Sequence, residues 1–106
     1  MSKYLISANY VGEGIKGLLK EGGSSRRAAI EKLVSSVGGS VESVYYAFGE
    51  TDIFVIVDMP NHASMSALSL SASSTGAVTI KTTVLMTPEE IDEAAKMTPD
   101  YRPPGQ

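Results

Sequence analysis

The sequence contains no cysteine and no tryptophan among its 106 residues. Without cysteine the chain cannot form disulfides, thiolate metal sites or a cysteine nucleophile, which excludes disulfide scaffolds and cysteine-dependent enzymes. The absence of cysteine also fits a reducing compartment, so we expect a cytoplasmic protein.

Long apolar runs and basic clusters are also lacking. No stretch approaches the roughly 20 apolar residues that cross a bilayer, and residues 1–10 alternate like a strand instead of forming a signal peptide. The 9 basic and 12 acidic residues give a net charge of −3, and the basic residues are scattered. Because a nucleic-acid surface needs a basic stripe, we expect neither a membrane nor a nucleic acid as partner.

Motifs of common catalytic sites are missing too, since neither a nucleophile elbow nor a Walker loop is present. His62 is the only histidine. No second histidine or cysteine stands at ligand spacing, so we expect no metal site and no cofactor. Haem ligation by His62 alone stays open as an alternative.

Apolar periodicity divides the chain into two successive strand–helix–strand units. Right-handed crossovers fold such an order into a four-stranded antiparallel sheet with helices on one face, the ferredoxin-like β-α-β-β-α-β sandwich of the α+β class. We expect one domain over residues 1–98, followed by an extended proline-rich arm over 99–106. The expected strands are residues 3–10, 40–48, 52–58 and 77–86, and the expected helices lie before Gly22 and over about 24–38, 61–75 and 88–97.

The strand over residues 53–57 is apolar on both faces, whereas the helices can cover only one face of the sheet. A second copy would bury the other face if two sheets packed about 10 Å apart, as in dimeric α/β barrels. We therefore expect a homo-oligomer. Tyr101 and Arg102 could dock the arm on a neighbouring subunit, and a free tail is the alternative.

Taken together, several short motifs make the chain resemble the GYD-domain family of small bacterial and archaeal proteins. These motifs are Gly14-Ile15-Lys16-Gly17-Leu18-Leu19, Arg26 with Arg27, Gly38-Gly39, and residues 45–52. The resemblance covers about residues 1–98 and implies the dimeric α/β barrel superfamily, with no assigned reaction. Gly49 and Asp52 match the family's named residues, while Thr51 stands where the family usually has tyrosine.

The segment 22–27 reads Gly-Gly-Ser-Ser-Arg-Arg at the start of a predicted helix. Ser24 or Ser25 could cap this helix, and free N–H groups at a helix start attract anions. Arg26 and Arg27 oppose the helix dipole there, so a bound carboxylate or phosphate would stabilise both. The alternative is a capped helix whose arginines are solvated or paired with nearby acidic residues.

Four polar side chains on the predicted sheet are further candidates for ligand binding. Tyr45 and Tyr46 point to opposite faces, so at most one lines a pocket on a given side, and core or interface packing is the alternative. Lys81 could be enclosed by a pocket or a partner sheet, or could be a solvated edge-strand lysine. Asp52 could act as a general base in an apolar pocket, or bind local backbone.

Three functions stay open on the sequence alone. We expect a homo-oligomeric small-molecule-binding protein whose pocket, between sheet and helices, prefers an anionic or aromatic ligand. The second hypothesis is a cofactor-independent enzyme, oxygenase- or isomerase-like, that uses Tyr45 or Tyr46, Lys81 and Asp52 in an apolar cavity. The third is a purely structural assembly module. An enclosed cavity with converging polar groups would favour the first two.

Overall fold

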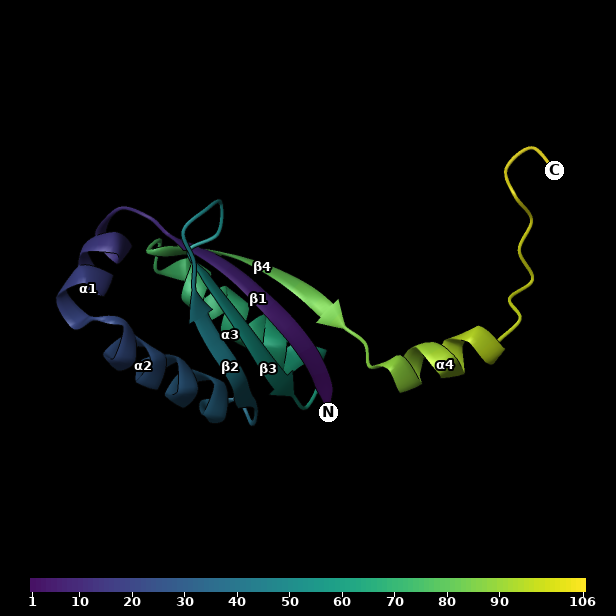
Figure 1. The fold of residues 1–106 in the computed structure, drawn as a ribbon, viewed down its shortest axis with the longest axis horizontal. Coiled ribbons are helices and arrows are strands. Elements are labelled where there is room, and N and C mark those ends of the chain that lie inside the picture. The colour runs from purple at the N-terminus through teal and green to yellow at the C-terminus, as the bar shows by residue number, and fades with distance from the viewer.

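A four-stranded antiparallel sheet organises the chain in a computed structural model, which describes residues 1–106 (Figure 1). The strand order β2-β3-β1-β4 confirms the predicted ferredoxin-like α+β fold. The elements are β1 (Ser2–Tyr10), α1 (Glu13–Glu21), α2 (Gly23–Ser36), β2 (Ser40–Tyr46), β3 (Ile53–Met59), α3 (His62–Ser74), β4 (Val78–Leu85) and α4 (Pro88–Lys96).

The alternation seen in the sequence sets the two faces of the sheet. On β1, Tyr4, Ile6, Ala8 and Tyr10 are buried while the residues between them are only half-buried. These four side chains point toward α2 and α3, because successive side chains on a strand point to opposite faces. The face that they form is called the helix-covered face below.

The core lies between this helix-covered face and the two long helices. All 11 buried residues are apolar, and α2 and α3 contribute Val34, Met65 and Leu68. Full burial of each such side chain stabilises the fold by about 1.5–3 kcal/mol. As the sequence predicted, α2 and α3 therefore cover one face of the sheet with their apolar residues.

The start of α2 differs from the prediction that Ser24 or Ser25 caps it. The helix begins at Gly23, its N-cap is Gly22 with φ 81°, and no side chain caps it. Glycine adopts this left-handed φ without the penalty that a Cβ would bring, which lets α1 turn directly into α2. Both serines consequently lie within the helix.

The other face of the sheet, called the open face, has no helix over it. Figure 1 looks onto this face, with α3 behind the sheet. It carries apolar side chains, including Tyr45 at 71% and Phe54 at 36% exposure. Toward the other end of this face, Lys3 bridges Asp58 at 3.0 Å and Glu42 at 3.1 Å. The prediction that β3 is apolar on both faces fits this arrangement.

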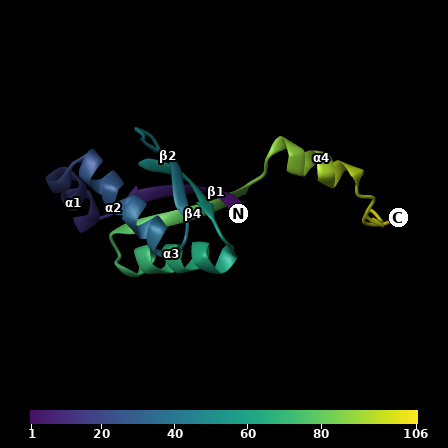
Figure 2. The same cartoon turned by 90° about the horizontal axis from the view of Figure 1, so that it is seen from below.

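The C-terminal part of the chain projects away from the sheet. Figures 1 and 2 both show α4 and the residues after it extending beyond the end of β4. The molecule is accordingly elongated, with extents of 56 × 32 × 24 Å. None of its helices combines the length and apolar character needed to span a bilayer.

Candidate functional site

A narrow apolar cleft lies between the sheet and the helices α2 and α3. Its volume is about 60 Å³, room for roughly two water molecules at about 30 Å³ each. Arg26 is the only charged residue among its 13 lining residues. The other lining residues are Ile6, Ala8, Tyr10, Ile30, Leu33, Val34, Ile53, Val55, Leu68, Ala72, Val78 and Ile80.

The two candidate arginines separate in the structure. Arg26 is half-buried and lines the cleft, and its guanidinium forms no ion pair. Arg27 is 63% exposed and places Nε 3.6 Å from a Glu31 carboxylate oxygen. Arg27 thus has the arrangement that the solvated, paired alternative described, and it does not line the cleft with Arg26.

Helical geometry explains why Arg26 points inward. Arg26, Ile30 and Leu33 occupy positions i, i+4 and i+7 of α2, so they share the stripe that faces the sheet. Arg27 lies one residue further round the helix, beside Glu31 one turn along. The cleft thus receives a positive charge at the end where α2 begins.

Tyr46 and Tyr10 lie at the same end of the cleft. The Tyr46 hydroxyl donates to the Gly23 carbonyl at 3.0 Å, which ties the end of β2 to the start of α2. Burial raises the pKa of Tyr46, and the neighbouring Tyr10 adds to this, while the Arg26 charge opposes it. Tyr10 is 8% exposed and borders the cleft beside Arg26. A cation and two phenols therefore gather where the apolar cleft ends.

Asp52 has a structural task at the neighbouring sheet edge. Its carboxylate accepts the Tyr10 backbone N–H at 2.9 Å, and its own N–H donates to Asn9 Oδ1 at 2.9 Å. The carboxylate therefore binds backbone, as the alternative reading held, although the backbone belongs to β1 and not to its own turn. By holding Tyr10 in place, Asp52 supports the phenol end of the cleft without lining it.

Tyr45 and Lys81 lie on the open face, away from Arg26. Tyr45 is opposite Phe54 in the register of β2 and β3, and Lys81 is opposite Ser7 in that of β4 and β1. Since β2 and β4 form the two edges of the sheet, these side chains are also far from each other. The prediction that Tyr45 and Tyr46 face opposite sides is confirmed.

The glycines at 12, 14 and 17 have the G-x-G-x-x-G spacing of dinucleotide-binding sites. Such a site needs a parallel strand–helix–strand unit, and both neighbours of β1 are antiparallel to it. Gly14 instead packs against the Ala77 carbonyl. Gly14 alone makes this close approach, since a Cβ at Gly12 or Gly17 would meet nothing within 4 Å.

Sequence reasoning also missed Tyr10 as a site residue, because its strand position marked it only as core. A second contact, between Tyr4 and His62, joins residues 58 positions apart. No local spacing in the sequence could have signalled this contact.

No group of three or more histidine or acidic side chains that could hold a metal ion is found.

Comparisons with known proteins give one match. A protein-family model for the GYD domain matches residues 4–95, from β1 into α4. The curated proteins and the solved structures give none.

Proposed function

This chain belongs to the GYD domain family, and on the basis of its cleft we propose that it is a homo-oligomeric small-molecule-binding protein. The proposed ligand has an aromatic or aliphatic body and an anionic head, a carboxylate or phosphate. The body would lie between sheet and helices, and the head would bind Arg26.

The observation that carries this proposal is a half-buried Arg26 that forms no ion pair at the end of an otherwise apolar cleft, although Glu13 and Glu21 border a neighbouring hollow with it. A charge partly withdrawn from water without a hydrogen-bonded counter-charge is costly to the fold. A carboxylate would accept two parallel hydrogen bonds from the guanidinium and offset that cost. The Tyr10 and Tyr46 phenols lie close enough to this end to contact an aromatic ring or an oxygen of the head.

The cleft is small for a whole ligand, since sites for drug-sized molecules measure about 300–1,000 Å³. Binding would therefore move α2 away from α3 by a small rigid-body shift. Gly22, between α1 and α2, has the backbone freedom to act as the hinge. The Tyr46–Gly23 hydrogen bond lies beside this hinge and would change with opening.

The enzyme hypothesis receives less support from the geometry. It required Tyr45 or Tyr46, Lys81 and Asp52 to converge in one cavity. Tyr46 lies near the cleft, Asp52 binds backbone, and Lys81 is exposed on the open face. Tyr46 and Asp52 do border one open hollow with Tyr10, but Lys81 lies apart from it, so the full set of acid–base groups does not converge within one chain.

The proposed second copy would cover the open face. Tyr45 and Phe54 expose aromatic surface there, and such surface is characteristic of interfaces. Two such faces packed together would bury both sheets, and Lys3 with its two carboxylates would lie at the rim.

The ligand proposal is tested by calorimetric titration with 2-naphthoate and with the uncharged 2-naphthalenemethanol. Naphthoate should bind more tightly, and Arg26→Gln should weaken its binding about tenfold, because glutamine keeps one donor and loses the charge and the second of the two hydrogen bonds. The matched control Arg27→Gln should leave the affinity unchanged, because Arg27 lies outside the cleft. Equal losses in both variants, or no binding of naphthoate or octanoate by the unaltered chain, would contradict the proposal.

A further inference from the structure

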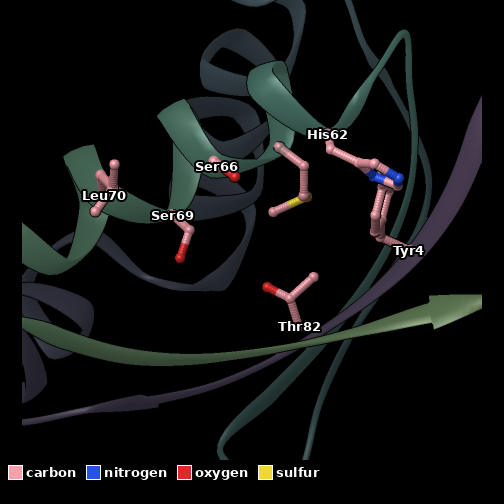
Figure 3. A pocket seen from close by; sticks show the side chains of 7 residues that line it. Tyr4, His62, Ser66, Ser69, Leu70 and Thr82 are labelled. Carbon is pink, nitrogen blue, oxygen red and sulfur yellow. The ribbon is translucent and has the colours of Figure 1, made fainter.

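A second hollow lies between α3 and β4, near the other end of β1 (Figure 3). Its volume is about 400 Å³. Tyr4 borders the hollow, whereas Ile6, Ala8 and Tyr10 border the cleft, so the two sites follow one another along β1. Met65 lines the hollow and Leu68 the cleft, and these buried side chains separate them. The residues lining the hollow are Tyr4, His62, Met65, Ser66, Ser69, Leu70 and Thr82.

This hollow exists because α3 does not cover β4 fully. Thr82 and Val84 lie on the helix-covered face, opposite Ile6 and Tyr4 of β1. Both are nevertheless exposed, Val84 at 58%. The β4 edge of the sheet thus forms one wall of an open cavity, and the exposed side of α3 forms the other (Figure 3).

Tyr4 and His62 form a hydrogen-bonded pair at one end of the hollow. The Tyr4 hydroxyl contacts His62 Nδ1, and the rings meet edge to face, with centroids 5.9 Å apart at 79°. Tyr4 is only 2% exposed, so the core fixes its position. His62 is the first residue of α3, next to the Asn61 cap whose side chain accepts the Ser64 N–H at 2.8 Å. The core therefore fixes Tyr4, while His62 is exposed and is placed by the capped start of α3.

The pair sets which ring nitrogen of His62 remains available. A neutral imidazole that accepts the Tyr4 hydroxyl proton at Nδ1 carries its own proton on Nε2. No side chain or backbone group in the chain hydrogen-bonds to Nε2. His62 therefore offers one oriented N–H donor at the hollow.

Hydroxyl groups continue the polar lining. Ser66 and Ser69 follow His62 at i+4 and i+7 on α3, which places all three on one stripe of the helix. Figure 3 shows Ser69 and Thr82 extending into the hollow from its two walls. Their hydroxyls form no hydrogen bond within the chain, and no charged residue lines the hollow.

We propose that this hollow is a second binding site, for a small uncharged compound that carries hydroxyl or carbonyl groups on an apolar frame. An oxygen of the ligand accepts the His62 Nε2 proton, the serine and threonine hydroxyls bind further oxygens, and Met65 and Leu70 contact the apolar frame. Tyr4 is a positioning residue, because it fixes the tautomer and orientation of His62. An anionic ligand gains no counter-charge here, which distinguishes this site from the Arg26 cleft.

His62 is the only histidine, so its ring resonances report on the hollow without ambiguity. We would titrate the isotope-labelled protein with cyclohexanol, cyclohexanone and, as the matched anion, cyclohexanecarboxylate. The two uncharged probes should shift the His62 ring signals saturably and bind about tenfold more tightly than the carboxylate. Absence of a saturable shift with both uncharged probes would overturn the proposal.

Two variants make the titration specific. Ser69→Leu fills the hollow from a surface position with a good helix former, so it should abolish the response, and an undiminished response would count against the site. Arg26→Gln leaves the hollow untouched and should leave the response intact. Because the Arg26 variant changes only the cleft, failure of one site is distinguishable from failure of the other.

The role of Tyr4 has its own spectroscopic readout. Unliganded His62 should be in the tautomer with the proton on Nε2, and Tyr4→Phe should shift it toward a mixture and weaken cyclohexanol binding. Unchanged nitrogen shifts in Tyr4→Phe would refute the positioning role. If that variant did not fold, the tautomer of the unaltered protein would still decide, since a proton on Nδ1 contradicts donation by Tyr4.

Discussion

Lys3 illustrates how a single residue links pH to stability in this fold. Its ammonium donates to Asp58 at 3.0 Å and to Glu42 at 3.1 Å. The hydrogen bond to Asp58 is the main cause that raises the pKa of Lys3 above its usual 10.5, and the one to Glu42 is the second. The protonated form is thus favoured in the folded chain. Its contribution is fully present below the unfolded pKa and is lost as pH rises through the folded one.

We therefore predict that the free energy of unfolding falls as pH rises above about 10. The raised pKa of Tyr46 acts in the same direction, because the fold favours its neutral phenol. Urea denaturation midpoints on either side of that pH should show a smaller decrease in Lys3→Met than in the unaltered chain. If Tyr46→Phe removed the whole decrease and Lys3→Met none, Lys3 would have no part in it.

For single residues, the sequence predicted which face of its helix or strand a side chain occupies better than it predicted which residues that side chain contacts. The stripe of α2 and the alternation of β2 determine the directions of Arg26 and Tyr46, and both follow from local periodicity. The Tyr4–His62 pair spans 58 positions, and the Asp52 carboxylate reaches the backbone of another strand. Such contacts depend on the register between strands and helices, which residue spacing alone does not encode.

At the scale of elements, the strands and long helices were predictable because the spacing of their apolar residues matches the period of a strand or a helix. The predicted ends of elements were wrong where backbone conformation or contacts with residues distant in the sequence determine where the element begins or ends. Gly22 and not a serine is the N-cap of α2, and the link between β2 and β3 runs over residues 47–52 instead of 49–51. That link is fixed by the hydrogen bond from Ala47 N–H to the Asp52 carbonyl and by the Asp52 carboxylate. β2 also has a register shift between Val41 and Ser43 that no pattern indicated.

The packing of α1 against the chain before β4 gives a sharp test with two glycines of one helix. A Cβ at Gly14 would lie 2.9 Å from the Ala77 carbonyl carbon and closer still to its oxygen, whereas a Cβ at Gly17 would meet nothing within 4 Å. Gly14→Ala should therefore cost about 1–3 kcal/mol by overpacking against backbone. Gly17→Ala should stabilise by about 0.5–1 kcal/mol, as expected at a half-buried helix position with free space for a Cβ.

Chemical denaturation of both variants measures these changes, with Gly17→Ala as the matched control. Equal stability of the two variants would show that α1 can move away from Ala77. In that case α1 would not anchor the Gly22 hinge next to it, and the proposed opening of the cleft would have to begin elsewhere.

The whole molecule leaves two groups of apolar side chains without cover. One is the open face. The other is the projecting C-terminal part, where Ile91 is 52%, Met97 63% and Tyr101 72% exposed. A helix as short as the nine residues of α4 is marginal in water even with its complete capping box. The apolar pattern of β3 predicted the uncovered side chains of the open face. The amphipathic sequence of α4 did not predict where this helix would lie relative to the sheet.

These two surfaces suggest how the proposed oligomer would assemble. The open face of one copy would pack on that of the other, and α4 with the arm over residues 99–106 would reach across to the partner. Ordering an extended proline-rich segment costs little entropy, and Tyr101 supplies an aromatic anchor. Such an arrangement would give α4 the tertiary contacts that a single copy does not provide.

Phe54→Glu tests this assembly most directly, because Phe54 lies on the central strand β3 of the open face. An unpaired carboxylate buried between two sheets is strongly unfavourable. In sedimentation experiments at micromolar concentration, the unaltered chain should therefore be at least dimeric and the variant monomeric. Phe48→Glu is the control, since Phe48 is fully exposed in the β2–β3 link and off the sheet. It should leave the mass unchanged.

Deleting residues 99–106 should loosen the oligomer and lower its melting temperature most at low protein concentration, because assembly stabilises by mass action. A monomeric unaltered chain would refute assembly through the open face, while leaving both ligand sites to their own tests.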